Sequence, residues 1–150
     1  MSRSYPERSA ARLYAVQALF QMEAADQGWE VVRDQFLSHR FGATLEEGEF
    51  LDGDIDLFTT LLEKVVDQQS RIDQATNEVL DKAWPIHRID PILRAIFRAA
   101  AAEYITNETP KNVVIDEYVE LAKSFASNDK QSKFTNGVLE ALSHSIALDH

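Results

Sequence analysis

Apolar residues recur at intervals of three and four along nearly the whole chain, and this spacing is the strongest constraint on its fold. Near the start, for example, Leu13, Val16 and Leu19 fall on one side of a helical wheel. No segment shows the period-two alternation that is typical of a half-buried strand. A chain of 150 residues, 45% of them hydrophobic, is also long enough to bury a substantial core. We therefore predict an all-α fold.

Caps, prolines and glycines divide this pattern into six or seven helices. Ser4 and Glu7 have the spacing of a capping box, which predicts a first helix over about residues 5–25. Asp90-Pro91 and Thr109-Pro110 each pair a capping residue with a proline suited to the first helical position. The other predicted helices cover residues 29–41, Leu57 to Leu80 with a break near Ser70, and 131–147, with a turn over 126–132.

An acidic stretch with three glycines, residues 41–54, separates the second helix from the third. Such glycine-punctuated segments are typical of connections. We predict a single domain over residues 1–150, made of two sub-bundles over about 5–50 and 54–147. The four alanines at 99–102 should let another helix pack closely against their own.

The formal net charge of −10 argues at first against a nucleic-acid partner. However, residues 44–81 hold eleven acidic residues against two basic ones, so this segment alone carries −9. The rest of the chain is nearly neutral, and a local basic patch is compatible with it. The positive residues outside the acidic segment gather in three places: Arg3, Arg8 and Arg12; Lys82, Arg88, Arg94 and Arg98; and Lys123, Lys130 and Lys133.

Several classes of protein are disfavoured by the sequence. No stretch approaches the roughly 20 apolar residues of a membrane span, and the first residues lack the apolar middle of a secretory signal, so we expect a cytoplasmic protein without membrane contact. The absence of cysteine excludes a thiolate nucleophile. A calcium-loop pattern over residues 52–63 fails at Leu57, where glycine is needed. We expect no enzymatic activity, no cofactor and no metal site.

Arginines of the first helix are candidates for RNA phosphate contacts. Arg8 and Arg12 lie four residues apart on one face, and Phe20 follows further along the helix as a candidate for base stacking. Two simpler interpretations stay open at this point. The arginines can be solvated charges on an exposed face, and Phe20 can belong to the core.

The Asn136-Gly137 pair lies in the second turn of the last predicted helix, where glycine costs about 1 kcal/mol relative to alanine. On a helical wheel Gly137 faces away from the core defined by Val138 and Leu142. Three explanations are open. A partner approaches the backbone here, another element of the protein crosses this face, or Asn136 caps a helix that starts late.

Three segments of the chain, residues 8–23, 84–104 and 109–142, closely resemble the NusB family of bacterial transcription antitermination factors. The last segment is the most specific. Its family-like motifs are Val114-Ile115-Asp116-Glu117, Glu120-Leu121-Ala122-Lys123 and Lys133-Phe134-Thr135-Asn136-Gly137-Val138-Leu139.

The resemblance implies an all-helical fold of two sub-bundles and a function. Proteins of this family bind single-stranded boxA RNA of ribosomal RNA transcripts together with the small-subunit ribosomal protein NusE. They act on elongating RNA polymerase with other Nus factors. The NusE-type partner is expected on a largely apolar surface near the fifth and sixth helices. The RNA-binding residues expected from the family pattern and the basic clusters are Arg8, Arg12, Phe20, Lys130, Lys133, Phe134 and Asn136.

Two other functions are compatible with the same fold. The first is a protein-interaction scaffold with weak or lost RNA binding, because Ser9 and Ala10 thin the arginine cluster and the middle of the chain is acidic. The second is the NusB-like accessory domain of ribosomal RNA cytosine methyltransferases. The lack of a cysteine nucleophile and of a catalytic domain disfavours it.

Overall fold

The computed structural model describes residues 5–41, 52–81, 83–125 and 129–147. Within these ranges the chain forms six α-helices, one π-helix and one turn of 3-10 helix, without any strand. The predicted all-α fold is thereby confirmed. The elements are α1 (Tyr5–Ala25), α2 (Trp29–Phe36), η1 (Leu37–Phe41), α4 (Asp52–Val79), η2 (Ile86–Arg88), α5 (Pro91–Thr106), α6 (Lys111–Phe125) and α7 (Asp129–Ala147).

Several helix ends have the capping residues that the sequence predicts. The side chain of Asp90 accepts a hydrogen bond from the backbone N–H of Ile92 at 2.9 Å, and Pro91 is the first residue of α5. Asn107 ends α5 in the left-handed conformation with φ 57°. The break predicted near Ser70 occurs two residues earlier, where Gln68 has non-helical angles of φ −116° and ψ 19°. The predicted cap Ser4 lies outside the described residues.

Two predicted boundaries are wrong. The α-helical part of the segment 29–41 ends at Phe36, and a π-helix follows to Phe41. On a continuous α-helix the side chains of Phe36 and Phe41 would point about 140° apart. The wider turn of a π-helix brings residues that are five positions apart onto the same side of the helix. The ring of Phe41 packs at 5.0 Å from those of both Tyr14 and Phe58, so packing decides this geometry. The turn predicted over 126–132 is shorter, because α7 begins at Asp129.

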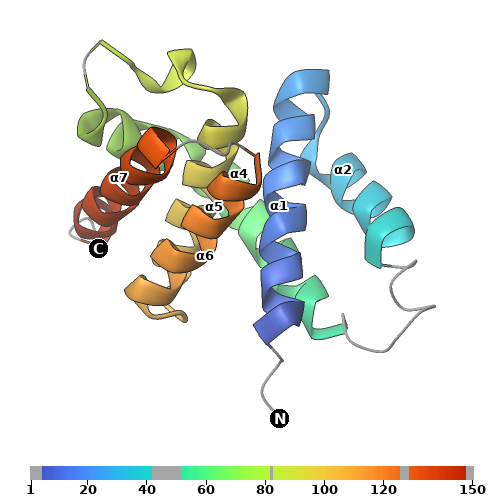
Figure 1. Cartoon of the computed structure of the whole chain (residues 1–150). Helices are drawn as coiled ribbons and strands as arrows, with labels where there is room; N and C mark the ends of the chain where they lie inside the picture. The colour runs from blue at the N-terminus through green and yellow to red at the C-terminus, as the bar shows by residue number, and fades with distance from the viewer. Residues whose placement is uncertain (1–4, 42–51, 82, 126–128, 148–150) are drawn as a thin grey trace.

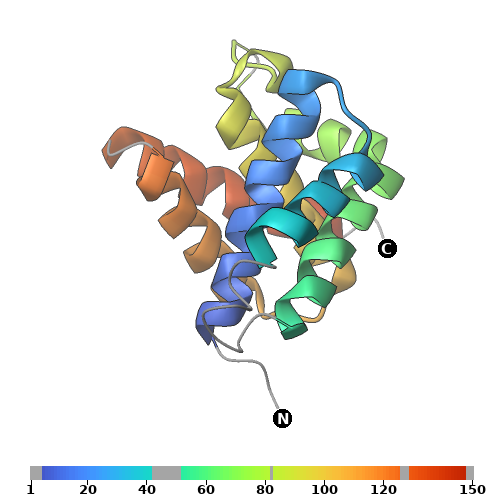
Figure 2. The ribbon, with the colours of Figure 1, turned by 90° about the vertical axis from the view of Figure 1, so that its right-hand side faces the viewer.

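Helix α5 lies at the centre of the molecule. It packs against α1, α4, α6 and α7, and its four alanines, Ala99 to Ala102, are completely buried. In Figure 1, α2 lies on the outer side of α1, while α6 and α7 lie on the opposite side of α5. Figure 2 shows α2 in front of α1 with α4 beside them. The close packing predicted for the alanine run is confirmed.

One cluster of buried apolar side chains extends through all six helices. Helix α1 contacts α2 and also α4 and α5, so it contributes to the core on both sides of the predicted sub-bundle boundary. The boundary itself falls mostly on residues 42–51, which lie outside the described ranges. The division into sub-bundles over 5–50 and 54–147 stays a prediction. None of the described helices is long and apolar enough to cross a membrane.

Candidate nucleic-acid interface

Arg12, one of the predicted phosphate contacts, lies inside the protein and is only 2% exposed. Its Nε and Nη2 donate hydrogen bonds to the two carboxylate oxygens of Glu103 at 2.7–3.2 Å. Its Nη1 donates to Oε1 of Glu117 at 2.7 Å. A guanidinium enclosed in this way does not reach an RNA phosphate. Neither interpretation of Arg12 agrees with this burial: Arg12 is not a solvated charge on an exposed face, and its guanidinium is not accessible to RNA.

The cluster around Arg12 joins three helices instead. Ser9 on α1 donates to Glu117 on α6, and the hydroxyl of Tyr118 donates to Glu103 on α5 at 2.9 Å. Burial by itself would raise the pKa of Glu103, but the hydrogen bonds and charge of Arg12 hold it below its usual value. Glu103 is therefore a buried carboxylate, stabilised by the arginine, and α1 is fixed against α5 and α6.

Arg8 lies one turn before Arg12 and is partly exposed. Its Nη2 donates a long hydrogen bond of 3.4 Å to Oγ1 of Thr109. The hollow around it, about 220 Å³, is also lined by Asp56 and Glu108. These two carboxylates reduce the attraction of a phosphate to this arginine. Arg8 is accessible, but its surroundings are not basic.

Phe20 is 40% exposed, as a base-stacking residue must be. It lines a groove of about 620 Å³ between α1, α2, α5 and α6, which we call the Phe20 groove. Phe125, at the end of α6, is also 40% exposed and lines the same groove. The other lining residues are Gln17, Gln21, Ala24, Ala25, Phe36, Arg40, Asp90 and Ile92. Two exposed aromatic rings, an arginine and several polar groups thus meet in one groove.

The residues predicted on the last helix differ in accessibility. Lys133 and Asn136 are exposed on α7. Phe134 is partly buried, and its ring packs edge-on against Phe97 with the centroids 6.1 Å apart. Lys130 belongs to α7, but its side chain lies outside the described residues. Phe134 therefore supports the core, and the lysine and the asparagine provide the accessible groups.

The structure excludes two of the three explanations for Gly137. Helix α7 starts at Asp129, so Asn136 is inside the helix and does not cap it. A Cβ atom added to Gly137 would have no heavy atom within 4 Å other than neighbouring backbone atoms of α7 itself. No other described element therefore crosses this face of the helix. The cap and the internal crossing are both wrong. Approach of a partner stays a prediction.

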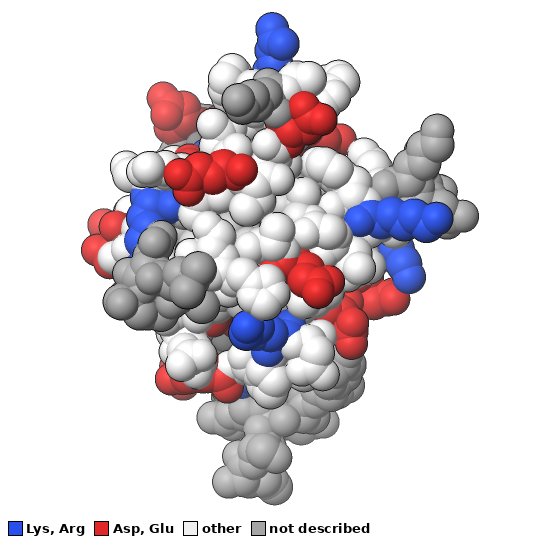
Figure 3. Space-filling model, turned by 90° about the vertical axis from the view of Figure 1, so that its left-hand side faces the viewer, with Lys and Arg blue, Asp and Glu red and all other residues white. Residues whose placement is uncertain are grey.

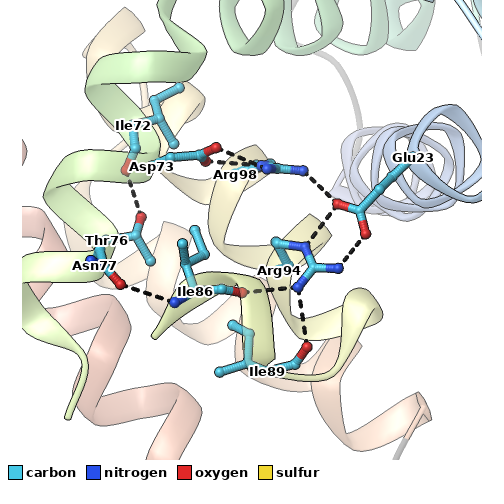
Figure 4. Close-up of polar contacts among 9 residues, drawn as sticks. All are labelled: Glu23, Ile72, Asp73, Thr76, Asn77, Ile86, Ile89, Arg94 and Arg98. Carbon is cyan, nitrogen blue, oxygen red and sulfur yellow. Dashed lines mark hydrogen bonds and ion pairs between the residues drawn. The ribbon is translucent and has the colours of Figure 1, made fainter. Parts of the chain in front are cut away.

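A second ionic network fixes the end of α1 that carries Phe20 (Figure 4). Glu23 on α1 accepts hydrogen bonds from Arg94 and Arg98 of α5. Arg94 also donates to the carbonyl oxygens of Ile86 and Ile89, at 2.9 and 3.2 Å. The hydrogen bond from Arg94 is the main cause that lowers the pKa of Glu23. This network holds the segment before α5 beside the Phe20 groove.

Arg98 completes the network through a paired contact with Asp73 of α4, at 2.8 and 2.9 Å. Arg94 is only 9% exposed, and both arginines have ionic partners within the protein. Neither of them is a free positive charge for a polyanion.

The predicted residues do not form one patch in the described part of the chain. Arg8 and Phe20 are twelve residues apart on α1, which corresponds to about 18 Å along the helix axis. Lys133 and Asn136 lie on α7, which packs against α4, α5 and α6. Of the predicted residues whose side chains the structure describes, only Phe20 lines the groove.

The profile of the NusB family matches residues 9–144 of the chain. The chain belongs to the NusB family. A transcription antitermination protein NusB from Gluconobacter oxydans is 41% identical over 139 residues, which are 91% of this chain and 86% of that protein. The one from Caulobacter vibrioides is 42% identical over 136 residues, 90% of this chain and 91% of that protein.

A solved NusB structure also shares this fold. The structure of T. maritima NusB superposes with a TM-score of 0.74 at 25% identity, covering 95% of this chain and 93% of that one. A crystal structure of the antitermination factors NusB and NusE in complex with dsRNA contains a chain that matches with a TM-score of 0.77. Its 22% identity, over 94% of this chain and 98% of that one, bears on the fold alone.

Sequence reasoning missed two features of this NusB-family surface. Phe125 has the helical spacing of an apolar face, yet its position in the last turn of α6 exposes it. The second feature is the burial of Arg12. The available signal was Glu103, an acidic residue directly after the four alanines at 99–102, since a buried carboxylate needs a partner of opposite charge.

Proposed function

We propose that this protein is a non-catalytic transcription antitermination factor that binds single-stranded boxA RNA of ribosomal RNA transcripts together with a NusE-type small-subunit ribosomal protein. The observation that carries the proposal is the Phe20 groove, in which two half-exposed aromatic rings meet in a chain of the NusB family. The relatives from Gluconobacter oxydans and Caulobacter vibrioides, both transcription antitermination proteins NusB, support antitermination as the function.

Stacking is the contribution that this groove offers to RNA binding. Bases of single-stranded RNA are free to leave their stack and pack on aromatic side chains. Each such contact is worth about 1–3 kcal/mol. Phe20 and Phe125 leave 40% of their surface available for it. Arg40 lines the same groove, where its guanidinium adds a positive charge close to an approaching phosphate.

Electrostatic attraction contributes little by comparison. The chain carries a net charge of −10, Arg12 is buried between two glutamates, and Arg8 lies beside Asp56 and Glu108. We therefore expect weak RNA binding by the protein alone and a shallow dependence on salt, since few phosphates are neutralised. Lys133 and Asn136, both exposed on α7, are the remaining proposed contacts. A basic protein partner would supply the missing positive charge.

The proposed surface for the protein partner lies near α5 and α6, the fifth and sixth predicted helices. Helix α5 is largely enclosed, so most of the accessible surface of this region comes from its neighbours. Ile115, Val119 and Leu121 of α6 are partly buried apolar residues. Figure 3 shows the face on the α7 side, where charged side chains are scattered among uncharged residues. The partly buried apolar residues of α6 suit a partner that buries apolar area. The RNA polymerase elongation complex with other Nus factors is the proposed target of the assembly.

The test is a titration of labelled boxA RNA with the protein, alone and with the NusE-type partner, at several salt concentrations. Phe20→Ala and Phe125→Ala should each weaken binding about fivefold or more, with the salt slope nearly unchanged. Trp84→Ala is the matched control, because Trp84 is a 60% exposed aromatic residue that does not line the groove. Equal effects of all three substitutions would contradict the assignment of the groove.

The alternative function is a protein-interaction scaffold of the same fold without useful RNA affinity. The burial of Arg12 and the carboxylates around Arg8 favour it, because the first makes one predicted phosphate contact inaccessible and the second weakens another. The same titration distinguishes the two functions. If boxA RNA binds no better than a scrambled RNA even with the partner present, the scaffold is the correct function.

A further inference from the structure

We propose that Gln17 determines which base occupies the Phe20 groove, and that this base is an adenine. The inference rests on the proposed function, since it names the part of the RNA that the groove recognises. Gln17 lines the groove and lies three residues before Phe20 on α1, so the two side chains are neighbours on one face of the helix.

The amide of Gln17 differs from that of its neighbour on the same helix. Its Oε1 is buried and accepts no hydrogen bond from any described residue. Buried polar atoms without a partner are uncommon in proteins. Gln21, which also lines the groove, is already engaged, because its Nε2 donates to Gln27 at 2.9 Å and to Gln35 at 2.7 Å. Among the described residues, Gln17 is thus a groove amide with a buried oxygen that lacks a donor.

A base in the groove can provide that donor. The last torsion of a glutamine side chain is soft, so a partial rotation about it brings both the oxygen and the nitrogen of the amide to the edge of the groove. A base stacked on Phe20 presents its edge to the adjacent Gln17. Adenine holds an amino donor, N6, beside a ring acceptor, N7, and glutamine pairs with these two atoms through its oxygen and nitrogen. Adenine therefore satisfies the unpaired oxygen and uses the amide nitrogen as well.

The experiment compares the wild-type protein with Gln17→Leu, both in the presence of the NusE-type partner. Each adenine of boxA RNA is replaced in turn by purine riboside, which lacks the N6 amino group. We expect a loss of affinity at one position for the wild type, roughly five- to hundredfold. The Gln17→Leu variant should bind the unmodified RNA more weakly by a similar factor and lose nothing further at that position. Gln74→Leu, at an exposed position of α4 outside the groove, should behave as the wild type.

Three results would overturn the inference. One is an equal loss at every adenine in both proteins, and another is sensitivity to no adenine at all. The third is unchanged or tighter binding by Gln17→Leu, which would indicate an apolar protein side chain in the groove. If Gln17→Leu does not fold, as judged by circular dichroism, Gln17→Met replaces it. Wild-type protein that binds no boxA RNA contradicts the proposed function itself, whereas binding without the adenine effect contradicts only the role of Gln17.

Discussion

Replacing Arg12 by methionine would leave the carboxylates of Glu103 and Glu117 buried without their cation. Arg12 donates hydrogen bonds to both of them, and the three side chains are at most 7% exposed. Removing one partner of a buried ion pair costs about 3–5 kcal/mol, because the remaining charge stays unpaired inside the protein. The free energy of unfolding of an ordinary domain is about 5–15 kcal/mol. We expect Arg12→Met to lower the free energy of unfolding by about 3–5 kcal/mol.

The same substitution should reverse the dependence of stability on pH in the acidic range. In the wild type the pKa of Glu103 lies below its usual value of 4.5, so its contribution is present above pH 4.5 and is lost as pH falls through the folded pKa. Without Arg12, burial is the dominant influence and raises this pKa. The folded variant then binds more protons than the unfolded chain above pH 4.5. Its stability should therefore decrease as pH rises from there.

Urea unfolding followed by circular dichroism between pH 4 and 7 measures both effects. With a denaturant slope of about 2 kcal/mol per molar, the midpoint at neutral pH should fall by roughly 2 M. Arg8→Met is the control, because Arg8 lies one turn away on α1 and, among the described residues, makes a single 3.4 Å hydrogen bond to Thr109. Similar losses for the two variants, or a wild-type pH slope in Arg12→Met, would refute the buried-cluster argument.

Three further substitutions test other parts of the structure. Gly137→Ala should raise the free energy of unfolding by about 0.5–1 kcal/mol, because the added methyl group meets open space; unchanged RNA affinity in this variant would contradict partner approach at Gly137. Glu23→Gln should lower the free energy of unfolding by about 1–2 kcal/mol at pH 7, after allowance for solvent screening. It should also weaken the loss of stability that the wild type shows as pH falls, because the depressed pKa of Glu23 depends first on Arg94. A pH dependence equal to that of the wild type, in thermal melts at pH 3–7, would count against this network. Tyr104→Phe should cost about 1 kcal/mol, because its hydroxyl donates to the carbonyl oxygen of Leu139 at 2.9 Å in a buried site; a melting temperature equal to that of the wild type would show that the bond contributes nothing.

The sequence determined the helices because the forces that begin and end them are local. The spacing of apolar residues predicts every α-helix, and Asp90 with Pro91 marks the start of α5 where the structure has it. The family motifs likewise depend only on the order of residues, and the NusB family follows from them. The π-turn after Phe36 was not predictable in this way, since it depends on the rings of Tyr14 and Phe58 from other helices.

Tertiary structure alone decided which polar and aromatic residues are accessible. Arg8 and Arg12 are equivalent on a helical wheel, yet only Arg12 meets glutamates from α5 and α6, about 90 and 105 residues away in the chain, and is buried between them. Phe125 follows the apolar spacing of α6 but is 40% exposed as the last residue of that helix. Periodicity specifies the direction in which a side chain points from its own helix, whereas exposure depends on which other helices pack there.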